Sequence, residues 1–424
     1  MSHPELERIN ARLADEQLKA REETVSNIIE LVKTGGDQAI TSLSEQLDKY
    51  QGELVAQAGG FANLSEDLQE ALKRAYIRIE KFHQEELKQG KLDQGWTYKG
   101  EYGENLGLRY QAIDSVAIYV PGGQAPLIST VLMTAIPAKV AGVRRIVLFS
   151  PPPINDGILA AAELCAIEEI YAIGGAQAIA AAAYGTETIK SVNKIVGPGN
   201  IYVSLAKKQV FGKVGIDGIY GPSELAIVAD SSASAKQVAA DLLSQLEHGS
   251  GLESVLLVSN SEDLITNTKH ELERQIDALN NPSLAETIRL SLESWSALIQ
   301  VSDLDEAAQI INDYAPEHLE LQLEEAHQFA TKIKAAGAIF IGANSCESLG
   351  DYLAGPSHCL PTAGSAKFSS GLQVIDFMTK SSIIDFSKAE EIDDLIKDVA
   401  TIARAEELEA HARAMEARKT NVTL

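Results

Sequence analysis

The sequence predicts an α/β protein built on parallel β-sheets, with helical segments at both ends of the chain. From Ser115 onward, short apolar strands alternate with Ala-rich helices, a pattern that favours βαβ units and parallel pairing. Several of these strands end in Gly or Pro just before a helix. Residues 1–90 and the segment after Asp385 instead carry apolar residues at helical spacing.

Composition limits the class of protein. The 424-residue chain is long enough to form two or more domains. Its 60 acidic residues against 36 Lys and Arg give a net charge of −24, which repels nucleic-acid phosphates and anionic lipids. Cys165, Cys346 and Cys359 are too few for a disulfide framework. With no export signal and no run of about 18 apolar residues, we expect a cytoplasmic protein without nucleic-acid or membrane partners.

The elements follow in chain order. Helices are expected in VSNIIELVKTGG (25–36) and LSEDLQEALKRAYIRIEKFHQEEL (64–87), the second capped by Asn63 or Ser65. Residues 96–108 are polar and rich in Gly, and we interpret them as the approach to a new domain. Strands are expected at 116–120, 145–149, 169–173, 194–196, 225–229, 255–258, 297–301 and 338–341, and further helices near 261–279 and 303–313. The tail EEIDDLIKDVATIARAEELEAHARAMEARK (390–419) predicts one or two helices whose apolar stripe must pack on something.

Three turns place glycine where a strand ends: PGGQAP (121–126), IGGAQAIAAAAYG (173–185) and VGPGNIYVSLAKK (196–208). Glycine lets a ligand approach the backbone closely, and the start of a helix favours a bound phosphate. The same glycines could serve only to make tight turns. Because the sequence lacks G-x-G-x-x-G, an ordinary dinucleotide fold is not indicated.

One helix carries Gln245 and His248 three residues apart near its end, on one face, where an amide oxygen and an imidazole could bind one metal ion. Alternatively, His248 only marks the end of a surface helix, where the helix dipole favours it.

Two more segments offer reactive side chains. Glu317 and His318 follow Pro316, just before an apolar alternation typical of a strand, and a carboxylate beside an imidazole suits proton transfer near neutral pH. Asp351 and His358 lie in a glycine-rich loop and could supply a metal ligand and a substrate contact. Each of these residues, taken singly, also fits an ordinary turn or strand position.

Together, these segments resemble the histidinol dehydrogenase family over about residues 20–418. The motifs that carry the resemblance are YVPGGQAPLISTVLM, AIPAKVAGV, GGAQAIAA, VGPGNIYV, GIDGIYGPSE, DLLSQLEHG, YAPEHLEL, GDYLAGPSHCLPT and ELEAHARAM. Leu246 and Gly249 depart from the family's usual Ala and Asp beside the expected metal ligands. These two departures bear on the shape of the substrate pocket.

The resemblance implies two Rossmann-like α/β domains of an incomplete dinucleotide-fold type, with N- and C-terminal helical extensions that pack on a partner subunit. The implied boundaries are 1–24 for an N-terminal helical arm, 25–114 with 225–370 for the first α/β domain, 115–224 for the second, and 371–424 for a helical tail. The first domain would hold the metal and catalytic residues, and the second would contact NAD. The tail would complete the partner's site in a homodimer.

The resemblance also implies the roles of individual residues. Gln245, His248 and Asp351 match the ligands of one zinc ion per subunit, with His411 of the partner as the fourth. Glu317 and His318 match the catalytic pair. Tyr119, Gln177 and Asn200 match positions that contact NAD. The residues implied to bind substrate are Ser223, Gln245, His248, Glu317, His318, Asp351, His358, Glu406 and His411.

The implied function is the NAD-dependent, four-electron oxidation of L-histidinol to L-histidine through bound L-histidinal, in the last steps of histidine biosynthesis. Two alternatives remain open from the sequence. One is a zinc- and NAD-dependent dehydrogenase of another small polar alcohol, such as a sulfopropanediol, and the other is a catalytically silent metal-binding relative. A thiohemiacetal route through Cys359 is a further alternative for the aldehyde step, but nothing near this cysteine signals a lowered thiol pKa.

Overall fold

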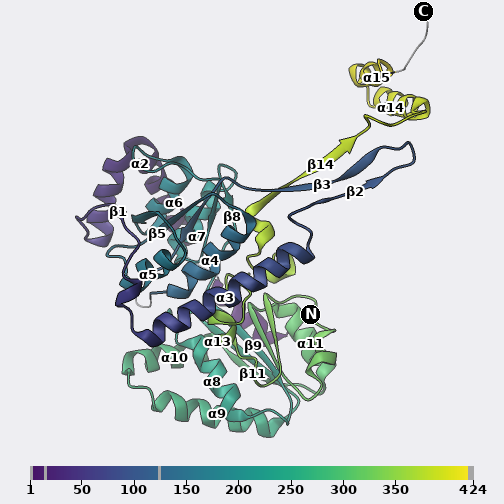
Figure 1. The fold of residues 1–424 in the computed structure, drawn as a ribbon. Helices are drawn as coiled ribbons and strands as arrows, with labels where there is room; N and C mark the ends of the chain where they lie inside the picture. The colour runs from purple at the N-terminus through teal and green to yellow at the C-terminus, as the bar shows by residue number, and fades with distance from the viewer. Residues whose placement is uncertain (1–2, 14–16, 123–125, 419–424) are drawn as a thin grey trace, which may run out of the picture. The chain divides into compact units, whose positions relative to one another are not determined.

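The computed structural model describes residues 3–13, 17–122 and 126–418 (Figure 1). The chain divides into two compact units. Unit 1 comprises Met1–Glu86 and Ala112–Phe377, and unit 2 comprises Leu87–Gln111 and Met378–Leu424. Among the described helices, none is both long and apolar enough to cross a membrane.

The first sheet of unit 1 has six strands in the order β1-β6-β5-β4-β7-β8. Only β1 pairs antiparallel, and the other neighbours are parallel. The strands are β1 (Val55–Ala56), β4 (Ser115–Tyr119), β5 (Arg145–Ser150), β6 (Glu169–Ala172), β7 (Lys194–Val196) and β8 (Gly215–Ile216). Apolar residues of α2 (Leu18–Leu43), α6 (Gly175–Tyr184) and α7 (Ile201–Val210) form one core cluster with this sheet, and α4 (Ile128–Ala141) and α5 (Asp156–Leu164) pack on each other.

The second sheet of unit 1 has five parallel strands in the order β11-β10-β9-β12-β13. They are β9 (Glu224–Ala229), β10 (Ser254–Ser259), β11 (Ala297–Gln300), β12 (His318–Gln322) and β13 (Ala338–Ile341). One face packs on α8 (Ala235–Leu246), α9 (Glu262–Asp277) and α10 (Pro282–Trp295). The other face packs on α1 (Pro4–Asn10), α11 (Leu304–Tyr314) and α12 (Ala326–Ala330). Unit 1 also contains α13 (Glu347–Tyr352) and most of α3 (Glu66–Gln89).

The alternation along β12 decides which side chains reach the site. Leu319 and Leu321 lie in the apolar cluster shared with α1 and α11. Because successive strand residues point to opposite faces, His318, Glu320 and Gln322 face the side of α8. All five residues of this strand are buried.

Unit 2 contains a three-stranded sheet in the order β14-β3-β2 and two helices. Its strands are β2 (Trp96–Lys99), β3 (Asn105–Ala112) and β14 (Met378–Asp385), and its helices are α14 (Asp393–Ala405) and α15 (Glu409–Glu416). Ala400, Ala403 and Ala412 are buried between the helices. Val399 and Ile402 of the predicted apolar stripe stay exposed, by 41% and 61%.

The predicted strands and helices of the two sheets are present, and most of their ends shift by one or two residues. The helix expected at 25–36 is longer, because α2 spans Leu18–Leu43. Three expectations differ from the structure. Residues 96–108, taken as a polar approach to a domain, form most of the β2–β3 hairpin, and the tail expected to be helical from 371 includes strand β14. The segment 25–56 packs on the first sheet through α2 and β1, whereas the resemblance implied that 25–114 belongs with residues 225–370.

The N-terminal helix α1 packs on its own chain. Leu6 and Ile9 of α1 are buried in the core cluster of the second sheet of the same chain. An amphipathic turn of helix gains most from the nearest apolar surface, and here that surface is the chain's own sheet. The packing of either extension on a partner subunit stays a prediction.

Candidate functional site

The catalytic pair predicted from the sequence lies at the start of β12. Helix α11 ends at Tyr314. The next residue, Ala315, adopts a left-handed conformation with φ of 53°, and Pro316 then prevents a further helical turn. The chain therefore turns sharply into the strand, and Glu317 and His318 enter the interior. Both side chains are almost fully buried, with 9% and 6% exposed.

Both members of the pair are held by the backbone of Glu224, the first residue of the neighbouring strand β9. The Glu224 N–H donates to Oε2 of Glu317 at 3.0 Å. The Glu224 carbonyl lies 3.2 Å from Nδ1 of His318. Because a carbonyl can only accept, Nδ1 carries the proton, and Nε2 is left as the free basic nitrogen in the neutral ring. Nε2 lies 3.7 Å from Oδ1 of Asp351 and has no hydrogen-bond partner among the described residues.

The Glu224 side chain is itself tied to the N-terminal segment. Its Oε1 accepts from the Ala363 N–H at 3.1 Å and pairs with the guanidinium of Arg12, and both charged side chains are buried. Burial raises the pKa of Glu224, and Arg12 opposes this by favouring the charged form.

The electrostatics of the pair depend on burial and on neighbouring carboxylates. Burial raises the pKa of Glu317 to about 8. Burial alone would lower the pKa of His318, but the carboxylates of Glu317, Glu347 and Asp351 outweigh it and raise this pKa to about 10. These acids therefore favour a cation close to the imidazole.

A cluster suited to a metal ion lies beside His318. One ligand atom each from His248, Glu347 and Asp351 lie within 4.8 Å of one another. His248 follows the end of α8, whereas Glu347 and Asp351 are four residues apart on α13 and so share a helix face. Burial would raise the pKa of Asp351, but His318 and the other imidazoles outweigh it and hold this pKa below its usual value.

Gln245, the other ligand predicted in unit 1, is fully buried on the last turn of α8. Neither polar atom of its amide has a hydrogen-bond partner among the described residues. A buried, unpaired amide is costly, and a cation bound through its oxygen would remove part of that cost. The residues present therefore fit a metal ion.

A cavity of about 530 Å³ opens onto part of this site. Its wall includes His318, Asp351 and His358, together with Phe340 and the backbone of the turn before β13. Ser223, predicted to contact substrate, lies directly before Glu224 and its carbonyl accepts from the Ser254 N–H at 3.1 Å.

His358 has both ring nitrogens engaged within the protein. Nδ1 lies 3.1 Å from the carbonyl of Asp351, and Nε2 lies 3.0 Å from the hydroxyl of Thr130. Burial lowers the pKa of His358, which favours the neutral ring. His358 thus steadies the chain at Asp351.

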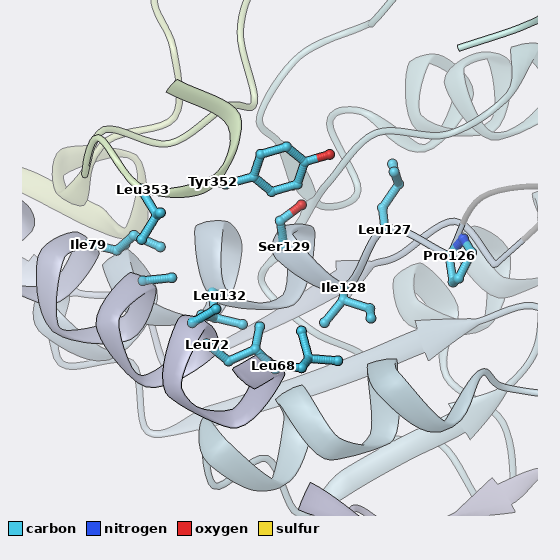
Figure 2. Close-up of a pocket in the computed structure, with 12 residues that line it drawn as sticks. Leu68, Leu72, Ile79, Pro126, Leu127, Ile128, Ser129, Leu132, Tyr352 and Leu353 are labelled. Carbon is cyan, nitrogen blue, oxygen red and sulfur yellow. The ribbon is translucent and has the colours of Figure 1, made fainter. Parts of the chain in front are cut away.

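A second cavity is apolar. It measures about 290 Å³ and lies between α3, α4 and the end of α13, as Figure 2 shows. Leu68, Leu72, Ile79, Leu132 and Leu353 point into it. Among its lining residues, only Ser129 and Tyr352 carry polar side chains. We therefore assign the chemistry to the larger cavity.

The residues predicted to contact NAD lie at the ends of strands in the first sheet. Tyr119 ends β4, and its hydroxyl oxygen accepts from the Gly175 N–H at 3.0 Å. Gln177 is buried on α6, with Oε1 unpaired among the described residues. Asn200 caps α7 by accepting from the N–H groups of Tyr202 and Val203. Residues 123–125 of the first glycine turn lie outside the described residues.

The loop that carries Asn200 is fixed by a buried ion pair. Lys207 and Asp217 pair in the interior, and they bond the carbonyl and the N–H of Gly197 respectively. Gly197 adopts φ of 111°, and a Cβ there would lie 2.2 Å from the carbonyl oxygen of Tyr119. Glycine is therefore required at this turn.

Glu406 and His411 lie in unit 2. Glu406 follows the last residue of α14, and His411 lies on α15. Within unit 1 the structure brings together His248, Glu317, His318, Asp351 and His358, and Gln245 lies three residues before His248. The roles of the two tail residues stay a prediction.

Sequence reasoning missed three carboxylates that shape the site: Glu347, Glu224 and Glu320. The first had a signal, since a carboxylate four residues before Asp351 shares its helix face. Glu224 acts through its backbone, for which no sequence pattern exists.

The comparisons with known proteins show the family of the chain. The family model for histidinol dehydrogenase matches residues 11–419. A histidinol dehydrogenase of Thermus thermophilus is 45% identical over 419 residues, covering 97% of this chain and 99% of the relative. That of Bacillus subtilis is 43% identical over 421 residues, covering 97% and 96%. The crystal structure of histidinol dehydrogenase from Elizabethkingia anophelis superposes with a TM-score of 0.88 at 35% identity, covering 96% of this chain and 92% of that one. The chain therefore belongs to the histidinol dehydrogenase family.

Proposed function

We propose that the site around Glu317, His318 and Asp351 carries out the family's reaction in two hydride transfers. The activity itself follows from family membership: the chain is an NAD-dependent oxidoreductase that oxidises histidinol in the final step of histidine biosynthesis. The observation that supports our assignment of residues is the geometry at Glu224. The peptide groups of Glu224 bind the Glu317 carboxylate and the His318 imidazole. They leave Nε2 of His318 free beside the possible metal ligands His248, Glu347 and Asp351.

We assign one zinc ion per subunit to Gln245, His248 and Asp351, with His411 of the partner subunit as the fourth ligand. Glu347 lies close enough to join this set or to replace a member of it. A donor set of imidazole, carboxylate and amide oxygen, without thiolate, suits zinc. When bound, the ion supplies positive charge that holds the nitrogen atoms of the substrate and offsets the carboxylates that raise the pKa of His318.

In the first transfer, Nε2 of His318 accepts the hydroxyl proton of L-histidinol while the hydride leaves the carbinol carbon for NAD. The bond from Nδ1 to Glu224 keeps the ring in the correct tautomer and stabilises the positive charge that forms. The product is L-histidinal, which stays bound.

In the second transfer, Glu317 accepts a proton from a water molecule as its oxygen adds to the aldehyde carbon. His318, protonated in the first transfer, returns that proton to the former carbonyl oxygen, which gives the neutral hydrate and restores the neutral imidazole. His318 then accepts a proton from the hydrate while the second hydride passes to a second NAD. The aldehyde becomes a carboxylate, so that four electrons leave the substrate in total. Burial, which raises the pKa of Glu317 to about 8, makes it a stronger base than a solvated carboxylate.

The remaining contacts complete the proposal. Tyr119, Gln177 and Asn200 contact NAD at the strand ends of the first sheet, where the start of α7 favours phosphate. Ser223 and His358, with Glu406 of the partner subunit, contact the substrate. The carboxylates around the cavity suit histidinol, which is a cation.

The test is a count of NADH formed per L-histidinol consumed by the zinc-loaded protein, against a panel of other amino alcohols and diols. We expect two NADH per histidinol, with histidine as the product. One NADH per histidinol would mean that the aldehyde is not oxidised and that Glu317 lacks its assigned role. Turnover of another alcohol in place of histidinol would overturn the substrate assignment.

A further inference from the structure

Glu320 is a fully buried carboxylic acid on β12, between β9 and β13 of the second sheet and two residues after His318. It faces the side of α8, while Leu319 and Leu321 pack in the core on the opposite face. A carboxyl group is costly to bury unless its oxygen atoms are hydrogen-bonded. The partners of Glu320 therefore indicate what this position does.

The hydrogen bonds of Glu320 reach two different helices, one directly and the other through Gln322. Oε1 of Glu320 accepts from the N–H of Glu347, the first residue of α13, at 2.7 Å. Oε2 accepts from Nε2 of Gln322 at 2.9 Å, and the same Nε2 donates to Oδ2 of Asp241 on α8 at 2.8 Å. A continuous chain of hydrogen bonds thus runs from the start of α13 through β12 to α8.

The two helices at the ends of this chain carry the proposed metal ligands. Gln245 lies one helical turn after Asp241, and His248 follows the end of the same helix. Asp351 lies one turn after Glu347 on α13. A helix is stiff over a single turn, so anchoring Asp241 and the Glu347 N–H sets the distance between the two groups of ligands.

We propose that Glu320 is a positioning residue for the metal site, which holds α8 and α13 at the separation that lets their side chains bind one ion. The inference rests on the proposed function, because it needs the metal site assigned there. Glu320 itself does not contact the ion or the substrate. Its effect passes through Glu347, Asp241 and the ligands that follow them.

Two substitutions separate the hydrogen bonds of this position from its volume. Glutamine keeps an oxygen that can accept from the Glu347 N–H, and leucine keeps the volume but removes every hydrogen bond.

The test measures zinc affinity instead of activity. Full-length protein is stripped with a chelator, and its affinity for Zn²⁺ is measured by competition with a chromophoric chelator. Replacing a residue that orients metal ligands typically lowers metal affinity by about 10- to 100-fold. We expect a loss of this size for Glu320→Leu. For Glu320→Gln we expect affinity within about threefold of wild type, because the amide still accepts from Glu347 and can donate to Asp241 or to the unpaired Oε1 of Gln322.

Leu321→Ala is the matched control, because it removes packing from the opposite face of the same strand. It should lower the melting temperature and leave zinc affinity unchanged, which separates positioning from general stability. Asp241→Ala removes only the hydrogen bond that links β12 to α8, and it should also weaken zinc binding. The inference therefore stays testable if Glu320→Leu does not fold.

Three outcomes of these measurements would overturn the inference. Zinc affinity equal to wild type in folded Glu320→Leu, or in Asp241→Ala if the former does not fold, overturns the positioning role while leaving the metal site in place. An equal loss in Leu321→Ala also overturns it, because the effect would then be general. Absence of zinc binding by wild type overturns the metal site itself, and with it this inference.

Discussion

Glu224 donates its backbone N–H to Glu317 at 3.0 Å, although both residues are acidic and both are buried. The same peptide segment accepts from His318 through its carbonyl, 3.2 Å from Nδ1. Two side chains that are adjacent in sequence are thereby fixed by one residue of the neighbouring strand. Each side chain has its own bond to Glu224, so Glu317 and His318 can be substituted and tested one at a time.

His318→Asn keeps a donor near the position of Nδ1 and removes Nε2. The bond to Glu224 should survive, while the base for both hydride transfers is lost. We expect kcat for histidinol and for histidinal to fall by about 10²- to 10⁴-fold, with a smaller change in KM. Steady-state kinetics with each substrate measures this. A variant that loses only the histidinol step would contradict a shared base.

Glu317→Gln should separate the two steps. The amide oxygen can still accept from the Glu224 N–H, so the geometry is kept, but the group no longer accepts a proton from water. Oxidation of histidinal should therefore fall by about 10²-fold or more, while the first hydride transfer is affected much less. A single-turnover experiment should show one rapid NADH and a slow second one. Equal slowing of both phases would argue that Glu317 acts only on the geometry of His318.

The buried ion pair between Arg12 and Glu224 can be tested through the stability of the protein. Removing one member of a buried ion pair typically costs about 3–5 kcal/mol, because the other charge stays buried without a partner. Arg12→Met should lower the free energy of unfolding by this order, measured by urea denaturation. Adding Glu224→Gln should recover part of the loss, since a neutral amide needs no counter-charge. Additive losses in the double variant would mean that the two side chains do not interact.

Cys359 tests the alternative route through a thiohemiacetal. Burial raises the pKa of Cys359, and likewise that of Cys165, to about 12. Below that pKa, the thiolate fraction falls about tenfold for each unit of pH, so at pH 8 both thiols should resist iodoacetamide in the folded protein. Their labelling should rise steeply with increasing pH, while the less buried Cys346 reacts first. Peptide mass spectrometry locates the label.

The companion measurement is the activity of Cys359→Ala. The substitution removes a buried sulfur that the proposed mechanism does not use, so this variant should still form two NADH per histidinol. Formation of only one NADH would restore the thiol route for the aldehyde step.

How far the sequence predicts the structure depends on the range of the interaction. The strands from 116 to 341 were predictable because each is a short apolar run bounded by Gly, Pro or a helix cap, which are local signals. The grouping of 25–56 with the first sheet was not, since it depends on α2 finding the apolar surface of α6 and α7. The hairpin β2–β3 was missed because exposed residues dominate its pattern.

Within the site, too, local motifs were predictable and contacts between distant segments were not. Motifs indicated His248, Glu317, His318 and Asp351, and the structure places these side chains together. The supports of the site are tertiary. Glu224 acts through its peptide groups, and Glu320 bridges α13 to α8 through a neighbouring glutamine. Backbone contacts of this kind leave no residue pattern in a single sequence.

The tail gives the last prediction. His411 lies on α15 in unit 2, and we assign it to the metal site of the partner subunit. If each site is shared, His411→Asn in one chain and His318→Asn in the other should complement. In a mixed dimer, one site would then carry both substitutions, and the other would carry neither.

Mixed dimers are prepared by co-expression with two different affinity tags. They should recover up to about half of the wild-type kcat, whereas either homodimer is nearly inactive because a missing base or ligand affects every site. Co-purified dimers of wild type with wild type, carrying the same tags, are the control. Complete inactivity of the mixed dimers would place His411 and His318 in the same site of a single chain, or show that the two sites depend on each other.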